Sequence, residues 1–217
     1  MKQSILLVFF FLFGASAFSQ RKADIGITGG TGYYQGDINP TFLFYSPKYN
    51  IGPVFRYNFN GRYSLRIQAI YANITGSDSD FDYVVTKRKY PVSFSNHMVN
   101  VAAQAEYNFF KYQTGINAGE WSPYMFGGFG YSIVFSGISP SHLTMPFGIG
   151  AKLNVTRRMS AGVQWGYNKT FNDKFDGAAW PVGNNGTLMF NNDWYSFLNI
   201  FITYKFFKFA ADCPTYD

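Results

Sequence analysis

The sequence has few charged residues, one cysteine and no long apolar run after its first residues. Only 14% of its 217 residues are Asp, Glu, Lys or Arg, whereas a soluble domain has about 25%. Beyond residue 19 no stretch approaches the ~18 consecutive apolar residues that cross a bilayer as a helix, which excludes a helical membrane protein. With Cys213 as its only cysteine, the chain has no internal disulfide.

Aromatic residues and glycines are abundant instead. Phe, Trp and Tyr make up 21% of the chain and 22 residues are Gly, yet the mean hydropathy is only −0.10. This combination indicates strands that are apolar on one side and polar on the other. The formal charge of +6 is spread along the chain, with "KRK" (87–89) and "RR" (157–158) as its only clusters. These are interpreted as loop and turn charges, so no nucleic-acid partner is expected.

The first 19 residues have the pattern of a secretory signal peptide. Lys2 precedes an apolar run from Ile5 to Phe13, and small residues at Ala17 and Ser19 predict cleavage before Gln20. No cysteine follows the cleavage site, so a lipoprotein anchor is not indicated. We expect one domain at residues 20–209, with a periplasmic tail at 210–217.

The glycine-rich segment "ITGGTGYYQGDINP" invites comparison with a nucleotide-binding loop. Gly30, Gly32 and Gly36 have one spacer too many for the dinucleotide fingerprint, and Pro40 follows where a helix should begin. The segment is therefore interpreted as a strand, with Gly26, Gly30 and Gly32 facing a narrow lumen and Ile25, Ile27 and Tyr33 facing lipid.

Apolar and polar residues alternate in eight runs, the period of half-buried strands. The runs cover residues 23–40, 51–59, 65–71, 99–109, 124–135, 143–155, 159–171 and 194–206. Short connections such as 60–62 and 156–158 alternate with longer ones at 36–48, 75–95, 136–142 and 172–193. The pattern predicts an all-β fold, an eight-stranded antiparallel transmembrane β-barrel with both termini in the periplasm of a Gram-negative bacterium.

The charges in the runs lie on the same face as the small residues, opposite to the apolar rows. Since a charge facing lipid costs a few kcal/mol at mid-depth, we expect these charges to form a cluster inside the barrel. A lumen of eight strands is just filled by side chains, so the cluster is interpreted as a structural plug rather than a binding site or pore. The cluster comprises Arg56, Arg66, Glu106, Lys152 and Lys205. An aromatic girdle at the lipid interfaces is expected from Tyr33, Tyr57, Tyr71, Tyr107, Trp165, Trp194 and Tyr204.

No catalytic, cofactor or metal site is predicted, and no small-molecule substrate is expected. His97 lies beside Ser95 and His142 beside Ser141, but sequence neighbours do not form a nucleophile and base pair, which requires convergence in space. Asp78, Asp80 and Asp82 have the alternate spacing of a calcium loop. However, they lack the glycine at its sixth position, and Lys89 stands where the bidentate glutamate belongs.

Two features point to the periplasm. An unpaired cysteine in an exported protein suggests an intermolecular disulfide or a free thiol, and both remain open for Cys213. The segment "FKYQTGINAGEWS" (110–122) is long for a periplasmic turn. It offers a candidate docking turn with Lys111, Tyr112, Glu120 and Trp121.

Several phrases resemble the PorG-type outer-membrane barrels of type IX secretion and gliding. They are "RYNFNGRYSLRIQAIY" (56–71), "SPYMFGGFGY" (122–131), "MPFGIGAKLNVTRRMSAGVQWGYNKTFND" (145–173) and "NDWYSFLNIFITYKF" (192–206). The resemblance implies a non-enzymatic component that sits in outer-membrane lipid and associates with a periplasmic ring lipoprotein and partner subunits. The alternatives are a generic OmpX-like barrel for surface binding or envelope stability and a lipid A-modifying enzyme.

Overall fold

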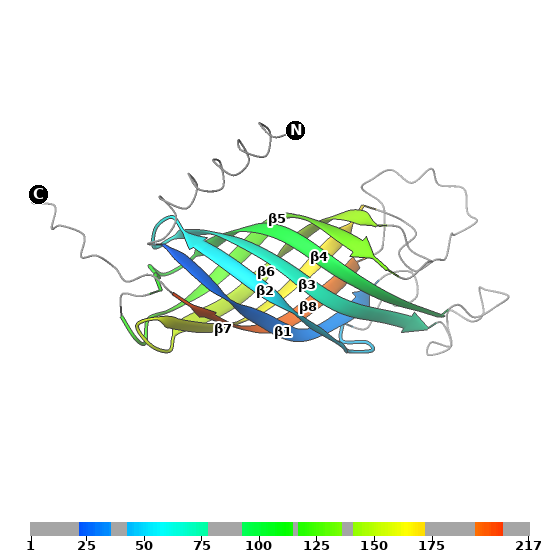
Figure 1. The fold of residues 1–217 in the computed structure, drawn as a ribbon, viewed down its shortest axis with the longest axis horizontal. Helices are drawn as coiled ribbons and strands as arrows, with labels where there is room; N and C mark the ends of the chain where they lie inside the picture. Colours follow the sequence, from blue (N-terminus) through cyan, green and yellow to red (C-terminus); the bar gives the residue numbers. More distant parts are fainter. Residues whose placement is uncertain are drawn as a thin grey trace, which may run out of the picture.

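The computed structural model describes residues 22–35, 43–77, 93–114, 117–135, 141–171 and 194–205, which form a closed barrel (Figure 1). The predicted signal peptide, the C-terminal segment with Cys213 and the aspartates of 78–82 lie outside the described residues. The strands are β1 (Ala23–Gln35), β2 (Lys48–Asn58), β3 (Tyr63–Ser77), β4 (Ser93–Asn108), β5 (Trp121–Val134), β6 (His142–Asn154), β7 (Met159–Thr170) and β8 (Trp194–Tyr204).

Each strand pairs with the next in antiparallel fashion, and β8 returns to β1 to close the sheet. The closing register runs from Ile25 opposite Tyr204 to Gln35 opposite Trp194. Every described strand therefore has two neighbours, which satisfies its backbone amides without water. The predicted eight-stranded antiparallel barrel is confirmed.

Large apolar side chains cover the outer surface of the wall. Ile27, Phe129 and Ile200 are 63%, 74% and 66% exposed, whereas Thr28 and Asn199 beside them in sequence point inward and are buried. A soluble barrel would show the opposite arrangement, so the outer wall suits acyl chains. Among the described residues, no helix has the length and hydropathy to cross a bilayer.

The two ends of the barrel differ in their connections. The turn end, at the left of Figure 1, carries the connections 59–62, 109–120 and 155–158. The loop end, at the right, is where strands joined by 36–47, 78–92, 135–141 and 171–193 terminate. These two names are used below.

Strands β3 and β4 run further toward the loop end than their alternation predicts. Asn73 to Ser77 pair with His97 to Ser93, whereas the registers of β2 with β3 and of β4 with β5 end at Ala72 and Met98. The two strands therefore form a ribbon beyond their outer neighbours, visible in Figure 1. The prediction stopped short because the outer face of this ribbon has no apolar row.

An apolar cluster fills the lumen near the loop end. Beneath it, Asn100 Nδ2 donates to Ser132 Oγ at 3.0 Å and to Tyr195 OH at 3.0 Å. The cluster seals this part of the lumen with side chains from four strands, β1, β3, β4 and β8. Its buried members are Tyr34, Ile70, Ala72, Ile74, Phe94, Met98, Tyr195 and Phe197.

Candidate functional site

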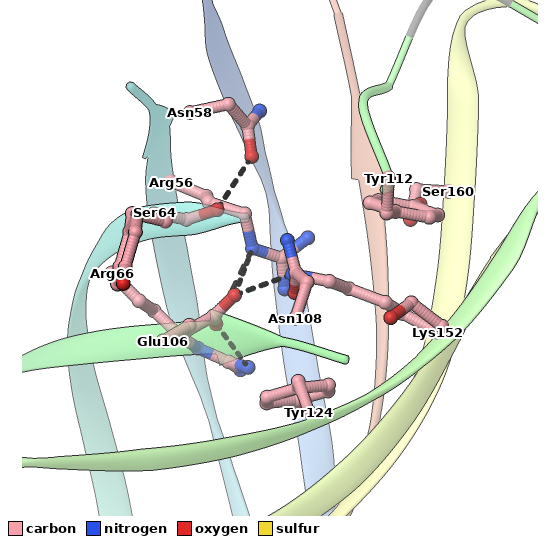
Figure 2. A network of polar contacts seen from close by, with 12 residues as sticks. Arg56, Asn58, Ser64, Arg66, Glu106, Asn108, Tyr112, Tyr124, Lys152 and Ser160 are labelled. Atoms are coloured by element: carbon pink, nitrogen blue, oxygen red, sulfur yellow. Dashed lines mark hydrogen bonds and ion pairs between the residues drawn. The ribbon is translucent and has the colours of Figure 1, made fainter. Parts of the chain in front are cut away.

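The turn-end half of the lumen holds one carboxylate surrounded by three cations (Figure 2). Glu106 of β4 accepts hydrogen bonds from Lys152 Nζ at 2.6 Å and from Arg56 Nε at 3.3 Å. Arg66 Nη1 lies 3.7 Å from Glu106 Oε1. All four side chains are fully buried. The structure thus brings together four of the five residues predicted for the lumen charge cluster.

Aromatic rings and an amide support the excess positive charge. The guanidinium carbons of Arg56 and Arg66 lie 4.8 and 4.6 Å from the ring centre of Phe201. Lys152 Nζ lies 4.7 Å from the ring centre of Tyr124. Such cation–π contacts strengthen when water is excluded. Arg66 Nη1 also donates to Gln164 Oε1 at 2.5 Å, which links the cluster to β7.

Glycines on the inner wall make room for these rings. A Cβ at Gly150 would meet the Tyr124 ring at 2.6 Å, and one at Gly162 would meet Phe201 Cζ at 2.5 Å. Both contacts are too close for a real Cβ. This explains why glycines alternate with aromatic residues along the chain: small residues on one strand seat the rings of another.

The cluster braces the barrel from within. Its members come from β2, β3, β4, β6 and β7, so its hydrogen bonds and ion pairs cross the lumen between strands that are not neighbours in the sheet. The charged atoms are surrounded by protein on all sides. The arrangement can hold the wall in one shape.

The fifth predicted residue, Lys205, lies at the turn end. Its Nζ donates to the carbonyl oxygen of Thr114 at 2.8 Å, and Thr114 Oγ1 donates to Asp24 Oδ2 at 2.8 Å. Asp24 also accepts from Asn58 Nδ2 at 3.0 Å. Sequence analysis did not single out Asp24, although it shares the inward face of β1 with Gly26 and Gly30.

The β4–β5 connection folds across the turn end and closes it. Its described residues 109–114 and 117–120 form what we name the turn-end cap. Asn154 Nδ2 donates to the carbonyl oxygens of Gln113 and Asn117 at 3.2 and 3.0 Å. The backbone nitrogen of Tyr112 donates to Gly61 O at 2.9 Å. The cap is therefore fixed to the β2–β3 turn and to the end of β6.

The cap corrects the prediction for Tyr112. This side chain is 1% exposed, and its hydroxyl bonds Ser160 Oγ inside the lumen (Figure 2). The Tyr112 ring points inward and packs over Lys152, whose Nζ lies 5.1 Å from the ring centre. Of the four predicted docking residues, Lys111 and Trp121 are exposed and Glu120 is half-buried.

Comparison with known proteins gives a family. The model of a domain of unknown function, DUF6089, matches residues 2–215. The chain belongs to the DUF6089 family. A search of curated proteins found no match for this DUF6089 chain.

Solved outer-membrane barrels resemble the DUF6089 chain in shape at low sequence identity. Neisserial surface protein A (NspA) superposes with a TM-score of 0.51 and 12% identity, over 85% of this chain and 97% of NspA. The N-terminal barrel of OprF from Pseudomonas aeruginosa gives 0.46 and 13%, over 83% and 97%. Ail from Yersinia pestis gives 0.45 and 12%, over 85% and 98%. The NspA match shows a shared fold.

The wall of the DUF6089 barrel fits the outer membrane of a Gram-negative bacterium. Outward apolar rows, inward charges and strands of 11 to 16 residues are the arrangement of outer-membrane barrels. The seven tyrosines and tryptophans predicted for the girdle all lie on outward positions of their strands. Tyr33 is only 7% exposed, because Phe44 packs edge-on against it at 5.2 Å.

The two histidines lie on opposite faces of the wall. His97 is exposed on the outer face, where Tyr71 OH lies 2.9 Å from its Nδ1, and His142 is buried on the inner face. The geometry does not bring them together. Among the described residues, no group of three or more His, Cys, Asp or Glu could hold a metal ion.

Proposed function

We propose that this barrel is an outer-membrane component of the type IX protein secretion and gliding machinery, and that it anchors a periplasmic ring assembly to the outer membrane. Its partners would be outer-membrane lipid, the ring lipoprotein and the partner subunits of that machinery. The proposal rests on the resemblance of four sequence phrases to PorG-type barrels together with the form of the turn end.

The turn-end cap is the observation that carries the proposal. It is held by hydrogen bonds to Gly61 and Asn154, and it leaves Lys111 exposed beside the edge-on ring pair of Phe110 and Trp121, 5.3 Å apart. A surface that is already ordered loses little conformational entropy when a partner binds. We therefore assign the docking role to Lys111, Glu120 and Trp121, without Tyr112.

The filled lumen supports a role at the ends of the barrel. The charge cluster and the apolar cluster occupy its turn-end half and its loop end with buried side chains. A protein whose described interior is packed in this way acts through its surfaces. In the proposed role the wall holds the protein in lipid, and the turn end holds the assembly.

The first experiment is deletion of the gene and analysis of exported proteins. Loss of type IX substrates from the medium, restored by the wild-type gene and not by a Lys111→Glu/Trp121→Ala variant, is the expected result. A Lys48→Glu/Leu143→Ala variant, changed at the loop end, is the matched control and should restore export. Unimpaired export in the deletion strain would contradict the proposal.

The second experiment tests Cys213. A pull-down without reducing agent should yield an adduct with a periplasmic lipoprotein that disappears in a Cys213→Ser variant. Non-covalent capture that is unchanged in this variant would retain the anchoring role and assign Cys213 as a free thiol.

One structural observation favours the OmpX-like alternative. The ribbon of β3 and β4 extends past its outer neighbours at the loop end, where an exposed edge could bind other surfaces. If this alternative holds, a barrel whose ribbon is shortened by removal of residues 73–97 and insertion of a two-residue turn should lose surface binding, while export stays normal.

A further inference from the structure

Exposed cations surround the turn end of the barrel. We name Lys22, Arg62, Lys111, Arg157 and Arg158 the cationic rim. All five are exposed or half-buried, and the described acidic residues at this end are Glu120 and the buried Asp24. The rim therefore carries a strong excess of positive charge.

The opposite end has the opposite sign. The four connections of the loop end contain seven aspartates and four lysines or arginines, a net charge of −3, and Lys48 and Lys169 near this end bring the sum to −1. The three connections of the turn end contain four cations and one glutamate, a net charge of +3. The positive charge of the chain is thus concentrated at the turn end, next to one leaflet of the membrane.

Aromatic residues of the outer wall hold three of the rim cations in place. Lys22 Nζ donates to Phe59 O at 3.0 Å, and Arg62 Nη1 donates to Phe109 O at 2.5 Å. Arg158 Nη1 lies 3.5 Å from Tyr204 OH. Phe59 and Phe109 are large exposed apolar residues in an outward belt of ring pairs with Tyr57 and Tyr107.

This attachment sets the height of the rim. Outward aromatic rings at the end of a membrane barrel lie at the level of the lipid headgroups. Side chains bound to those rings or to their backbone lie at the same level or just beyond it. The rim cations are therefore at the depth of the phosphate groups.

The rim follows the circumference of the barrel. Lys111 lies against the β2–β3 turn: a Cβ added to Gly61 would lie 3.5 Å from the Cβ of Lys111. Lys111 therefore neighbours Arg62. Lys22 reaches the same turn from β1, and Arg158 reaches the end of β8 from the β6–β7 turn. A ring of cations around an apolar wall matches a shell of lipids better than the single face that a protein partner would contact.

We propose that the cationic rim binds the phosphate headgroups of anionic glycerophospholipids in the leaflet that surrounds the turn end. Guanidinium groups pair with phosphate through two parallel hydrogen bonds. Each cation near an anionic membrane surface strengthens binding about fivefold. The headgroups would hold the turn end at a fixed depth and orientation.

The test compares bound lipids on the purified full-length protein. Delipidated protein in detergent is mixed with equal amounts of phosphatidylglycerol and phosphatidylcholine, and the adducts are counted by native mass spectrometry. We expect wild type to carry at least fivefold more phosphatidylglycerol, and this preference to fall as salt is raised.

Two variants with the same loss of charge decide the outcome. Arg62→Gln/Arg157→Gln in the rim should reduce the preference at least fivefold, whereas Lys48→Gln/Lys169→Gln at the loop end should keep it. Heat-modified mobility on gels confirms that each variant is folded, and Arg157→Gln alone serves if the rim double variant is not. Equal binding of both lipids by wild type, or an unchanged preference in the rim variant, would overturn the proposal.

A protein partner would give another pattern. If rim cations serve the secretion assembly instead, the rim variant loses partner capture while wild type shows no lipid preference, which also overturns the lipid proposal. Because the lipid measurement uses no partner and no secretion assay, its result is independent of the proposed secretion role.

Discussion

The carboxylate of Glu106 on β4 accepts a hydrogen bond from the ammonium of Lys152 on β6 at 2.6 Å. Glu106 is also the shared counter-ion of Arg56 and Arg66. One negative charge thus keeps three cations compatible with a buried site. The brace depends more on Glu106 than on any single cation.

Replacing this carboxylate should destabilise the barrel strongly. Glu106→Gln leaves three buried cations without a counter-ion, and removing one partner of a buried pair costs about 3–5 kcal/mol. Reversible urea unfolding in lipid vesicles measures the loss. Adding Lys152→Met should recover part of it, because one excess charge is removed. Glu120→Gln, at the turn end, should change the unfolding free energy by less than about 0.5 kcal/mol; a similar loss in both single variants would contradict the brace.

The inner-wall glycines give a second prediction. Gly162→Ala places a methyl group 2.5 Å from Phe201 Cζ and 2.5 Å from Ala151 O, so the ring that supports both arginines must move. Overpacking of this kind costs about 1–3 kcal/mol. Gly127→Ala is the matched control, because no atom lies within 4 Å of its added methyl. Equal unfolding free energies of the two variants would show that the space at Gly162 for the Phe201 ring does not contribute to stability.

The turn-end cap gives a third prediction, measured by proteolysis. Tyr112→Ala removes the buried ring that holds the cap in the mouth of the barrel, so trypsin should cut after Lys111 at least tenfold faster in detergent-solubilised protein. The exposed Arg157–Arg158 turn provides an internal reference for trypsin activity. Tyr112→Phe keeps the ring and should remain close to wild type. Cleavage after Lys111 at the same rate in all three proteins would mean that the cap is already open.

The outer wall gives a fourth prediction. Phe129 lies near the middle of β5 and is 74% exposed, so Phe129→Lys should cost about 2–4 kcal/mol in a bilayer. Phe135, just past the end of β5, is also exposed, and Phe135→Lys should cost about 0–1 kcal/mol. Vesicle unfolding of the two variants measures this depth dependence, and a cost that does not vary with position would argue against a lipid-facing wall.

Much of the fold follows from local alternation. Each strand shows its inward and outward faces in its own sequence, as with the charged side chains of Arg56 and Lys152 opposite the apolar rows. Strands with these two faces pair in order into one closed barrel. The fold class, the number of strands and the position of the charges in the lumen could therefore be predicted.

Other features depend on the stagger between strands, which no single strand reveals. Tyr124, Gln164 and Phe201 have inward parity, but only the register brings them to the height of Glu106. Lys205 follows the last residue of β8, and Tyr112 belongs to a connection without any period. The outer face of the β3 and β4 ribbon is polar, so an outward apolar row could not show where it ends.

The orientation of the wall toward lipid is the central claim, and spin labels test it most directly. In a Cys213→Ser background, single cysteines replacing Ile27, Phe129 or Ile200 are labelled, and the protein is reconstituted in vesicles. If the apolar rows face lipid, apolar oxygen reaches all three labels and a water-soluble nickel complex does not, as for sites among acyl chains. Ready access of the nickel complex to these three positions would show that the apolar rows face water and that the wall is not in lipid.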